Sequence, residues 1–370
     1  MLDFVLIRHA WPVDSADAAL GLRAIQAGLP PHAEVLVGMS VEEALALKAG
    51  SGCGRMLYLE SCWLSLDARC WERLEWGLSQ GLDVAVACDS VSPEPMPAVG
   101  YATLRGMERQ VAGVEPAVAG LLPGFAGRVA VGSVDGWQRV LQGRGRVARV
   151  AGAWAHDSSG YFGSDRQEML PLVPVGLGDV LDVGGGEGGF LSALKQREPG
   201  VQTHLVELTE QAASVARACG GVDQVWVGSF LDWRPARRFD CISFLDVLEH
   251  MVDPERALRH AVGLLRPGGG LVLSIPNVGH WSVVADLLEG RWDWAPAGIH
   301  CYTHVRFFTR RTIEDMLNRL GLEAEAWIEV KVPASDEWLE AWGVSRGLVV
   351  DRDALQTYAY GLRVRPRREA

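Results

Sequence analysis

The chain has 370 residues, more than the roughly 100 to 200 residues of one typical domain, so we expect two domains. Hydrophobic residues make up 48% of the chain and charged residues 22%, which excludes a largely disordered protein. The formal net charge of −11 argues against a broad electrostatic grip on nucleic acid phosphates. We therefore expect a folded protein whose partner is not a nucleic acid.

The cysteines and the apolar segments indicate where in the cell the protein is found. The seven cysteines are scattered and no two are spaced as C-x-x-C, which fits a reducing environment. The apolar run near the N-terminus, Phe4–Ile7, is too short for a signal peptide. The longest uncharged stretch, residues 267–285, contains Pro276 and Asn277 and is typical of a strand and a loop. We predict a cytoplasmic protein without a membrane span.

Residues 1–141 have the pattern of a small α/β domain of unknown role. Short apolar runs alternate with segments of helical period: the runs are Phe4–Ile7, Val35–Gly38, Met56–Leu59 and Val84–Ala87, and the helical segments are Ala16–Ala27 and Asp67–Ser79. Residues 55–89 resemble the nucleotide-sugar half of a glycosyltransferase, but the Asp-x-Asp expected in residues 57–62 is absent. An interaction or substrate-gathering role is the alternative.

The Gly/Arg stretch at residues 142–149 predicts a linker, and a second α/β domain follows over residues 150–370. Its alternating elements predict βαβ units and a parallel sheet. The expected strands are Val180–Val183, His204–Glu207, Val225–Val227, Phe239–Phe244 and Gly270–Ile275, and the expected helices are Phe190–Arg197, Gln211–Cys219, Pro254–Leu265 and Thr312–Leu320. The extended runs Leu322–Val332 and Leu355–Val364 should pair as an antiparallel hairpin.

A glycine-rich loop, residues 182–189, lies between the first of these strands and the first helix. Glycines there let a ligand approach the backbone, and the helix N-terminus offers unpaired N–H groups. Glu207 ends the next strand, where an acidic side chain can accept both hydroxyls of a ribose. The loop also satisfies the dinucleotide pattern G-x-G-x-x-G. These residues alone therefore do not distinguish a dinucleotide from another nucleotide-like ligand.

Five ordered motifs decide between these two kinds of ligand. They are VLDVGGGEG at residues 180–188, FDCISFLDVLEH at 239–250, LRPGG at 265–269, IPNVGHW at 275–281 and THVRFFT at 303–309. With these motifs, residues 150–365 resemble the class I S-adenosylmethionine-dependent methyltransferases, in the small-molecule branch that includes the ubiquinone-biosynthesis O-methyltransferases and glycan-associated methyltransferases. The resemblance implies a Rossmann-like, mostly parallel sheet with an antiparallel last strand.

The resemblance also implies S-adenosyl-L-methionine as the cofactor and assigns residues to it. The amino-acid part of the cofactor would face Asp182, Gly184, Gly186 and Gly188, and its ribose would face Glu207 and Leu208. The adenine would face Ser229 and Phe230, and the edge near the sulfonium would face Asp246 and Val247. The entry helix of the family would include Tyr161 and Arg166. The acidic residue usual at position 229 is a serine here, which can still hydrogen-bond the adenine amino group. Asp246 could instead cap a helix that begins near Leu248.

Histidine is the natural general base, because its ordinary pKa leaves it largely neutral at physiological pH. Four histidines, at positions 250, 280, 300 and 304, should follow strands at the ligand-binding edge of the sheet, and each could instead be a hydrogen-bonded structural residue. We expect His250 and His304 to be the catalytic ones, and we expect no metal ligands. Cys301 stands where the family pattern usually has an aspartate.

We therefore predict methyl transfer to a small-molecule acceptor, at the oxygen of a sugar or other biosynthetic intermediate, with nitrogen as the alternative atom. Two other functions stay open: a noncatalytic cofactor-binding scaffold for the N-terminal domain, and an NAD-dependent oxidoreductase. The number of chains in the functional protein is left open, with a homo-oligomer as one possibility.

Overall fold

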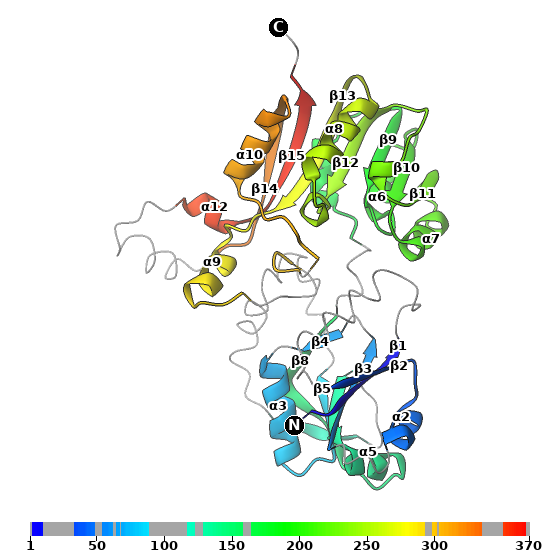
Figure 1. Ribbon diagram of the computed structural model, residues 1–370, viewed down its shortest axis with the longest axis vertical. Helices are drawn as coiled ribbons and strands as arrows, with labels where there is room; N and C mark the ends of the chain where they lie inside the picture. Colours follow the sequence, from blue (N-terminus) through cyan, green and yellow to red (C-terminus); the bar gives the residue numbers. More distant parts are fainter. Residues whose placement is uncertain are drawn as a thin grey trace. The chain divides into compact units, whose positions relative to one another are not determined.

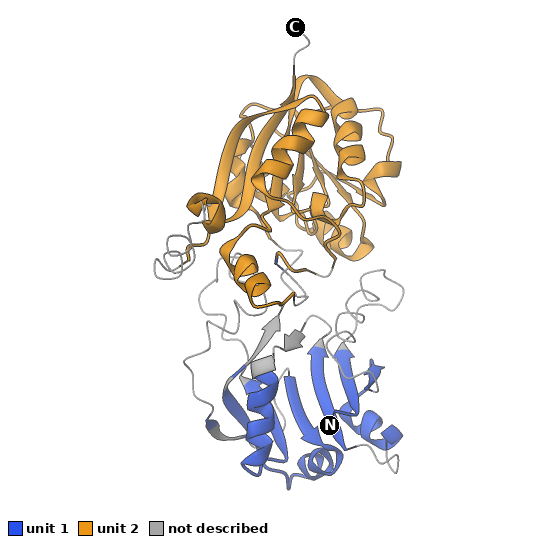
Figure 2. Ribbon diagram, turned by 60° about the vertical axis from the view of Figure 1, so that its left-hand side comes forward, with its two compact units in different colours: residues 1–159, 293–298 blue, residues 160–292, 299–370 orange. Residues whose placement is uncertain are grey.

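The computed structural model divides into two compact units between Ser159 and Gly160 (Figure 2). Each unit is an α/β sheet domain with its own hydrophobic core (Figure 1). No helix of the described part of the chain is long and apolar enough to cross a membrane. The structure describes residues 2–9, 33–48, 54–61, 64–66, 68–88, 117–122, 129–157, 164–292, 298–301, 303–334 and 351–367.

The first unit is built on a mixed sheet with the strand order β2-β1-β3-β7-β5-β8-β4, and β6 pairs with β8. The strands are β1 Phe4–His9, β2 Glu34–Val37, β3 Arg55–Ser61, β4 Leu64–Leu66, β5 Val84–Cys88, β6 Val118–Leu122, β7 Val129–Ser133 and β8 Val147–Asp157. The helices are α2 Val41–Lys48, α3 Ala68–Ser79 and α5 Val134–Leu141. The helix expected at residues 16–27 lies outside the described residues.

Successive strand residues point to opposite faces, so the first sheet has two cores. Helix α3 covers one face with Cys70 and Leu74. Helices α2 and α5 cover the other, where Trp137 is fully buried.

The boundary between the domains lies later than residues 142–149, where the sequence predicted a linker. Strand β8 begins at Val147 and pairs in parallel with β5, placing Val147 opposite Val84. Val147, Ala148 and Val150 are buried in the two cores of the first unit. The high Gly/Arg content of this stretch concealed a strand, and the first unit extends to Ser159, beyond the predicted end of the first domain at residue 141.

The second unit contains a seven-stranded sheet with the order β11-β10-β9-β12-β13-β15-β14. All pairs from β11 to β13 are parallel, and β15 runs antiparallel to both β13 and β14, which confirms the expected fold and terminal hairpin. The strands are β9 Asp179–Val183, β10 Gln202–Glu207, β11 Gln224–Val227, β12 Phe239–Leu245, β13 Leu265–Pro276, β14 Leu322–Lys331 and β15 Thr357–Pro366. The α-helices are α6 Gly189–Arg197, α7 Glu210–Ala218, α8 Pro254–Leu264, α9 Trp281–Leu288, α10 Arg310–Arg319 and α12 Arg352–Gln356.

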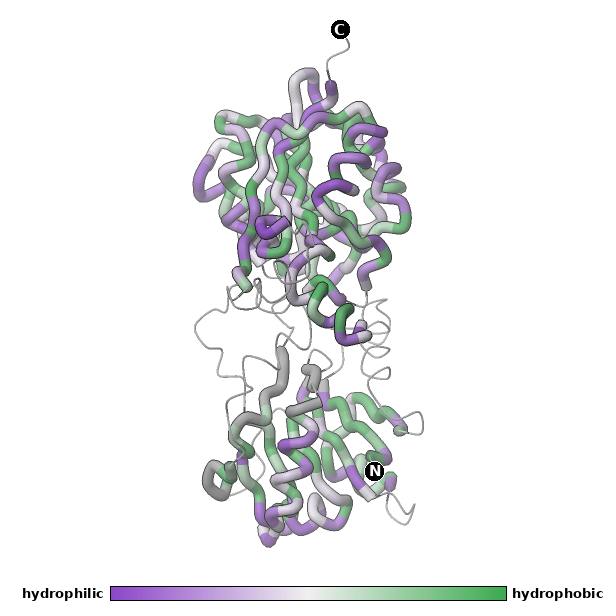
Figure 3. The backbone as a smooth tube through the Cα atoms, turned by 90° about the vertical axis from the view of Figure 1, so that its left-hand side faces the viewer, coloured by the Kyte–Doolittle hydropathy of each residue, from purple (hydrophilic) through white to green (hydrophobic). Residues whose placement is uncertain are grey.

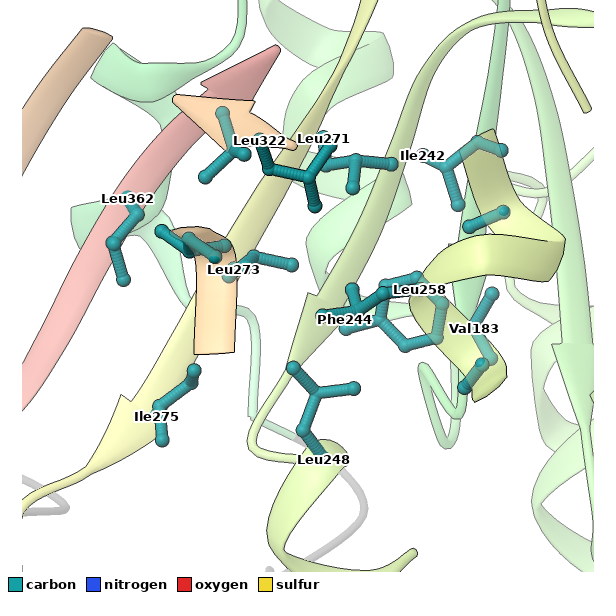
Figure 4. Close-up of a cluster of buried hydrophobic side chains, with 14 of the residues drawn as sticks. Val183, Ile242, Phe244, Leu248, Leu258, Leu271, Leu273, Ile275, Leu322 and Leu362 are labelled. Carbon is teal, nitrogen blue, oxygen red and sulfur yellow. The ribbon is translucent and has the colours of Figure 1, made fainter. Parts of the chain in front are cut away.

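Two cores sandwich this sheet, because its strands are apolar on both faces. Figure 4 shows one of them, where Phe244 of the sheet lies near Leu258 of α8. The other core holds α6 through Phe190 and Leu194. The hydropathy colours of Figure 3 follow this arrangement, with green, apolar stretches along the strands and purple, polar ones along the helices and turns.

Local capping signals fix where the helices begin. Asp253 caps α8 by accepting a hydrogen bond from the Arg256 N–H at 2.9 Å, and Pro254 occupies the first turn. Thr309 and Thr312 form a capping box at the start of α10.

Because β9 to β13 are parallel, their carboxyl ends and the loops that follow them meet at one edge of the sheet. The candidate site lies at that edge.

Candidate functional site

The loop after β9 is shaped by glycines whose Cβ positions are occupied by other atoms. Gly184 and Gly186 have φ angles of 68° and 56°, a region that L-residues rarely adopt. A Cβ on Gly185 would lie 2.2 Å from Oδ2 of Asp182, and one on Gly184 would lie 2.9 Å from the Val247 side chain. The backbone of the loop is therefore tightly wrapped around the Asp182 carboxylate and packs against the loop after β12.

Asp182 is a buried carboxyl group without a cationic partner among the described residues. Its Oδ1 accepts a 2.6 Å hydrogen bond from the Ser243 hydroxyl, and its Oδ2 has no hydrogen-bond partner in the described part of the chain. Burial raises the pKa of Asp182 to about 7, and the nearby Glu207 carboxylate adds to this rise.

Glu207, at the end of β10, is buried and tied to the glycine loop. Its Oε2 accepts a hydrogen bond from the Gly186 N–H at 2.9 Å, and its Oε1 accepts from the N–H and hydroxyl of Thr209 at 2.9 and 3.1 Å. Two buried carboxylates, Asp182 and Glu207, therefore flank the glycine loop.

The remaining residues assigned to the cofactor differ in their placement. Gly188, with a φ of 79°, begins α6, and a Cβ there would lie 2.6 Å from Val222, so it serves helix packing. Leu208 follows Glu207 and is 66% exposed, and Ser229 precedes a short 3₁₀ turn after β11. Tyr161 lies outside the described residues.

Phe230, which the resemblance assigns to the adenine, belongs to the hydrophobic core. Its side chain is buried in the core, with its ring 5.4 Å from that of Phe244 and 4.8 Å from that of His260. The ring packs the turn after β11 onto the sheet.

The loop after β12 is held by a charged network. Asp246 has a φ of 56°, an unusual backbone conformation for a residue other than glycine. Its Oδ2 lies 2.7 Å from Nη1 of Arg166, its Oδ1 accepts a 2.7 Å hydrogen bond from the Ser274 hydroxyl, and Arg166 donates to the same hydroxyl at 2.6 Å. Arg166 thus joins the entry segment to the ends of β12 and β13.

Val247 follows Asp246 and packs against Gly184, so the loops after β9 and β12 are in contact. The helix-capping role considered for Asp246 is not observed. The 3₁₀ helix over Leu248–His250 has Val247 at its N-cap and no side-chain cap.

Glu249 lies in that 3₁₀ helix and is only 1% exposed. Neither of its carboxylate oxygens has a hydrogen-bond partner within the described residues. Burial raises the pKa of Glu249 well above its ordinary value, and the Asp246 carboxylate adds to this effect. Its backbone carbonyl accepts hydrogen bonds from the N–H groups of Val305 and Arg306, at 2.9 and 3.0 Å, which fixes the THVRFFT loop beside it.

The two predicted catalytic histidines meet at Glu249. The rings of His250 and His304 are 4.6 Å apart, and Nε2 of His304 is 3.9 Å from Oε1 of Glu249. Burial lowers the pKa of His304 to about 3, with a contribution from His250, and burial also lowers the pKa of His250. Both rings are therefore neutral at physiological pH.

The other two histidine candidates are placed differently. His280 caps α9 through Ser282, and its Nε2 lies 3.1 Å from the Val332 carbonyl, as expected of a structural histidine. His300 is buried, and its ring lies 4.2 Å from that of Trp292.

Sequence reasoning missed three residues of this site, Glu249, Ser274 and Tyr358. Glu249 stands within the LEH motif, and only its burial beside two histidines marks it. Tyr358 lies in β15, 112 residues from Asp246 in the chain, and burial raises its pKa, with Asp246 adding to the rise. No local sequence signal links it to this edge of the sheet.

These residues fit S-adenosylmethionine on structural grounds. The Asp182 carboxylate has an oxygen without a hydrogen-bond partner among the described residues beside a glycine-rich loop, and this suits the ammonium group of an amino acid. Glu207 offers a buried carboxylate on the other side of the same glycine loop, where its Oε2 accepts a hydrogen bond from the Gly186 N–H. An acidic side chain at this place suits the hydroxyls of a ribose.

Comparisons with known proteins relate the second unit to methyltransferases. Residues 153–326 match the family model described as a methyltransferase domain. The chain is 32% identical over 153 residues to the ubiquinone biosynthesis O-methyltransferase of Idiomarina loihiensis, covering 39% of this chain and 61% of that protein. It is 29% identical over 130 residues to the protein of the same name from Coxiella burnetii, covering 33% and 55%.

A solved structure of an S-adenosylmethionine-dependent methyltransferase from Archaeoglobus fulgidus is 19% identical, with a TM-score of 0.39, and the match covers 55% of this chain and 96% of that one. The chain spans 61% and 55% of the two curated relatives. Residues 153–326 are thus similar to a methyltransferase domain, and the strand order of the second sheet agrees with the Rossmann-like fold that the sequence resemblance implied.

Proposed function

We propose that this domain transfers the methyl group of S-adenosylmethionine to a hydroxyl oxygen of a small molecule, a sugar or another biosynthetic intermediate. The observation that carries the proposal is the cluster of Glu249, His250 and His304. Glu249 and His250 follow β12, which pairs with β9, the strand that leads into the glycine loop. These side chains can take part in removing a hydroxyl proton. The name of the curated relatives, O-methyltransferases, supports oxygen as the acceptor atom.

The protein's task in such a reaction is alignment. When bound, S-adenosylmethionine supplies a methyl group already activated by a positively charged sulfur. Asp182, Glu207 and the glycine loop hold and orient the ligand, while the network of Arg166, Asp246 and Ser274 keeps the adjoining loop in one conformation. Orientation of reactants alone is worth roughly 7 to 11 kcal/mol of barrier in favourable cases.

The hydroxyl proton must leave as the oxygen attacks the methyl carbon. His250 is half-buried and His304 is 7% exposed, so His250 is the more accessible of the two predicted catalytic residues. The lowered pKa values keep both imidazoles neutral, but they also make each a weak base on its own. We therefore assign the ionisation of the acceptor hydroxyl to the environment that these three side chains create, and not to one histidine acting as a base.

The test uses S-adenosylmethionine carrying a ¹³C-methyl group and a panel of phenols, sugars and amines. We expect acceptor-dependent release of S-adenosylhomocysteine and a new ¹³C resonance in the O-methyl region. A resonance in the N-methyl region would contradict the choice of oxygen. Tight cofactor binding without turnover on any acceptor would instead support the scaffold role.

A further inference from the structure

We propose that Glu249, His250 and His304 bind one divalent transition-metal ion, which holds the acceptor's hydroxyl oxygen beside the cofactor site. The catalytic part of this inference rests on the proposed methyl transfer, whereas metal binding by the chain does not.

The ligand set and its spacing carry the proposal. One carboxylate and two imidazoles each offer an atom to this cluster, and these atoms all lie within 4.8 Å of one another. Ligands on one zinc ion sit about 2.0 to 2.2 Å from the metal, so two of them are at most about 4 Å apart. Side-chain shifts of less than about 1 Å would complete the site. Two imidazoles and a carboxylate are a donor set of zinc and iron sites, and imidazole favours such ions over Mg²⁺ or Ca²⁺.

The backbone orients both histidines for this role. Nδ1 of His304 is 3.0 Å from the Ile299 carbonyl, and Nδ1 of His250 is 3.3 Å from the Thr303 carbonyl. Each carbonyl can only accept, so it favours the tautomer with the proton on Nδ1 and the lone pair on Nε2. Metal-binding histidines are usually fixed by a second hydrogen bond of this kind. Nε2 of His304 is the atom that approaches Glu249, at 3.9 Å.

Glu249 supplies the independent observation. Its carboxylate is almost completely buried, and within the described residues neither oxygen has a hydrogen-bond partner. An unpaired buried carboxylate costs several kcal/mol unless it is neutralised or paired, and buried charges in proteins are typically paired or bound to metals. Arg166 is not available to it, because that guanidinium is paired with Asp246. A divalent cation would satisfy Glu249 and use both neutral imidazoles.

Three protein ligands leave coordination positions for the acceptor. A hydroxyl bound to the ion loses its proton more readily, and the proton passes to solvent. The oxygen then forms its bond to the methyl carbon, the carbon–sulfur bond breaks, and its electron pair returns to the sulfur. The ion is not consumed and changes no oxidation state.

The experiment begins with the full chain, stripped of metal by a chelator and titrated with Co²⁺ and Zn²⁺ without cofactor or acceptor. We expect one equivalent of Co²⁺ per chain, with visible absorption bands that Zn²⁺ displaces. The variants E249Q and H304Q should each weaken binding by more than the roughly 10- to 100-fold that follows loss of an outer-shell partner. H260Q is the matched control, since it removes a histidine of α8 whose Nε2 lies 3.0 Å from the Trp233 carbonyl. It should bind like the wild type.

Thermal melting of the metal-free proteins shows whether the variants fold. E249Q should melt close to the wild type, because glutamine keeps the size of the side chain and Glu249 has no side-chain hydrogen bond to lose among the described residues. Equal Co²⁺ binding by the wild type, E249Q and H304Q, or no binding by any of them, would overturn the proposal. Full turnover with a verified acceptor in the presence of chelator would overturn its catalytic part alone. Metal binding without any methyl transfer would leave the metal site in place and refute the proposed function.

Discussion

The environment of Asp182 makes a quantitative prediction for the variant Asp182→Asn. Burial raises the pKa of this carboxyl from 3.8 to about 7, and each pKa unit corresponds to 1.36 kcal/mol. Ionised Asp182 therefore costs the cofactor-free fold about 4 kcal/mol above neutral pH. Asparagine keeps the shape and can still accept the hydrogen bond from Ser243, but it carries no charge.

The sign follows from proton uptake. Between pH 4 and pH 7 the folded state holds a proton on Asp182 that the unfolded state has released, so stability falls as pH rises across this window and is constant above it. Asp182→Asn lacks this contribution. We expect its free energy of unfolding, relative to the wild type, to rise by about 4 kcal/mol from pH 4 to pH 8.

Urea denaturation of both proteins at several pH values measures this difference, and other titrating groups cancel in the comparison. Asp315→Asn, on the exposed side of α10, is the control that removes an equal charge without burial, and its effect should hardly change with pH. Calorimetry should show that Asp182→Asn also weakens binding of S-adenosylhomocysteine. A stability difference that is the same at pH 4 and pH 8 would refute the idea that Asp182 is a desolvated, unpaired acid.

Three further results are expected. Gly186→Val should abolish binding of S-adenosylhomocysteine in calorimetry. The control Gly176→Val, at a glycine with a φ of 75° and open space around it, should retain binding. Equal binding by both variants would contradict the cofactor site. Arg166→Leu, which leaves Asp246 without its partner, should lower the free energy of unfolding in urea by about 1.5 to 3 kcal/mol, and no change would mean that the pair is not formed in solution. A chain of residues 158–370 should fold and bind S-adenosylhomocysteine, because β8 belongs to the first sheet; aggregation or loss of binding would show that the two units depend on each other.

The fold of the second unit could be predicted because its sequence is consistent at every level. Strands β9 to β13 contain short apolar runs, and the loop between β9 and α6 is recognisable by its glycines. The boundary of the first unit could not be predicted in the same way. Arginine and glycine around Val147 are typical of a linker, and only pairing with β5 shows that a strand begins there.

The candidate site was predictable where its residues stand next to their strands, as Asp182, Glu207 and Asp246 do. It was not predictable where contacts join distant parts of the chain. Glu249 and His304 are 55 residues apart, and they meet because the Glu249 carbonyl accepts the N–H groups that follow His304. The burial of the Phe230 ring against Phe244 was likewise not visible from the sequence, because it depends on the fold that brings the two residues together.

The two edges of the second sheet differ in a way that bears on function. At the amino edge, burial alone would raise the pKa of Asp179, but hydrogen bonds from Arg266 and His204 lower it, so this acid is stably ionised. At the carboxyl edge, Asp182 and Glu249 lie deeper and their pKa values are raised. A fold selected for stability alone would pair these acids as it pairs Asp179, so the unpaired ones mark the edge where bound cations complete the structure. Binding of the ammonium group of S-adenosylmethionine at Asp182, and of a metal ion at Glu249, should therefore each raise the melting temperature, and the two increments should be separable because each acid lies in its own loop.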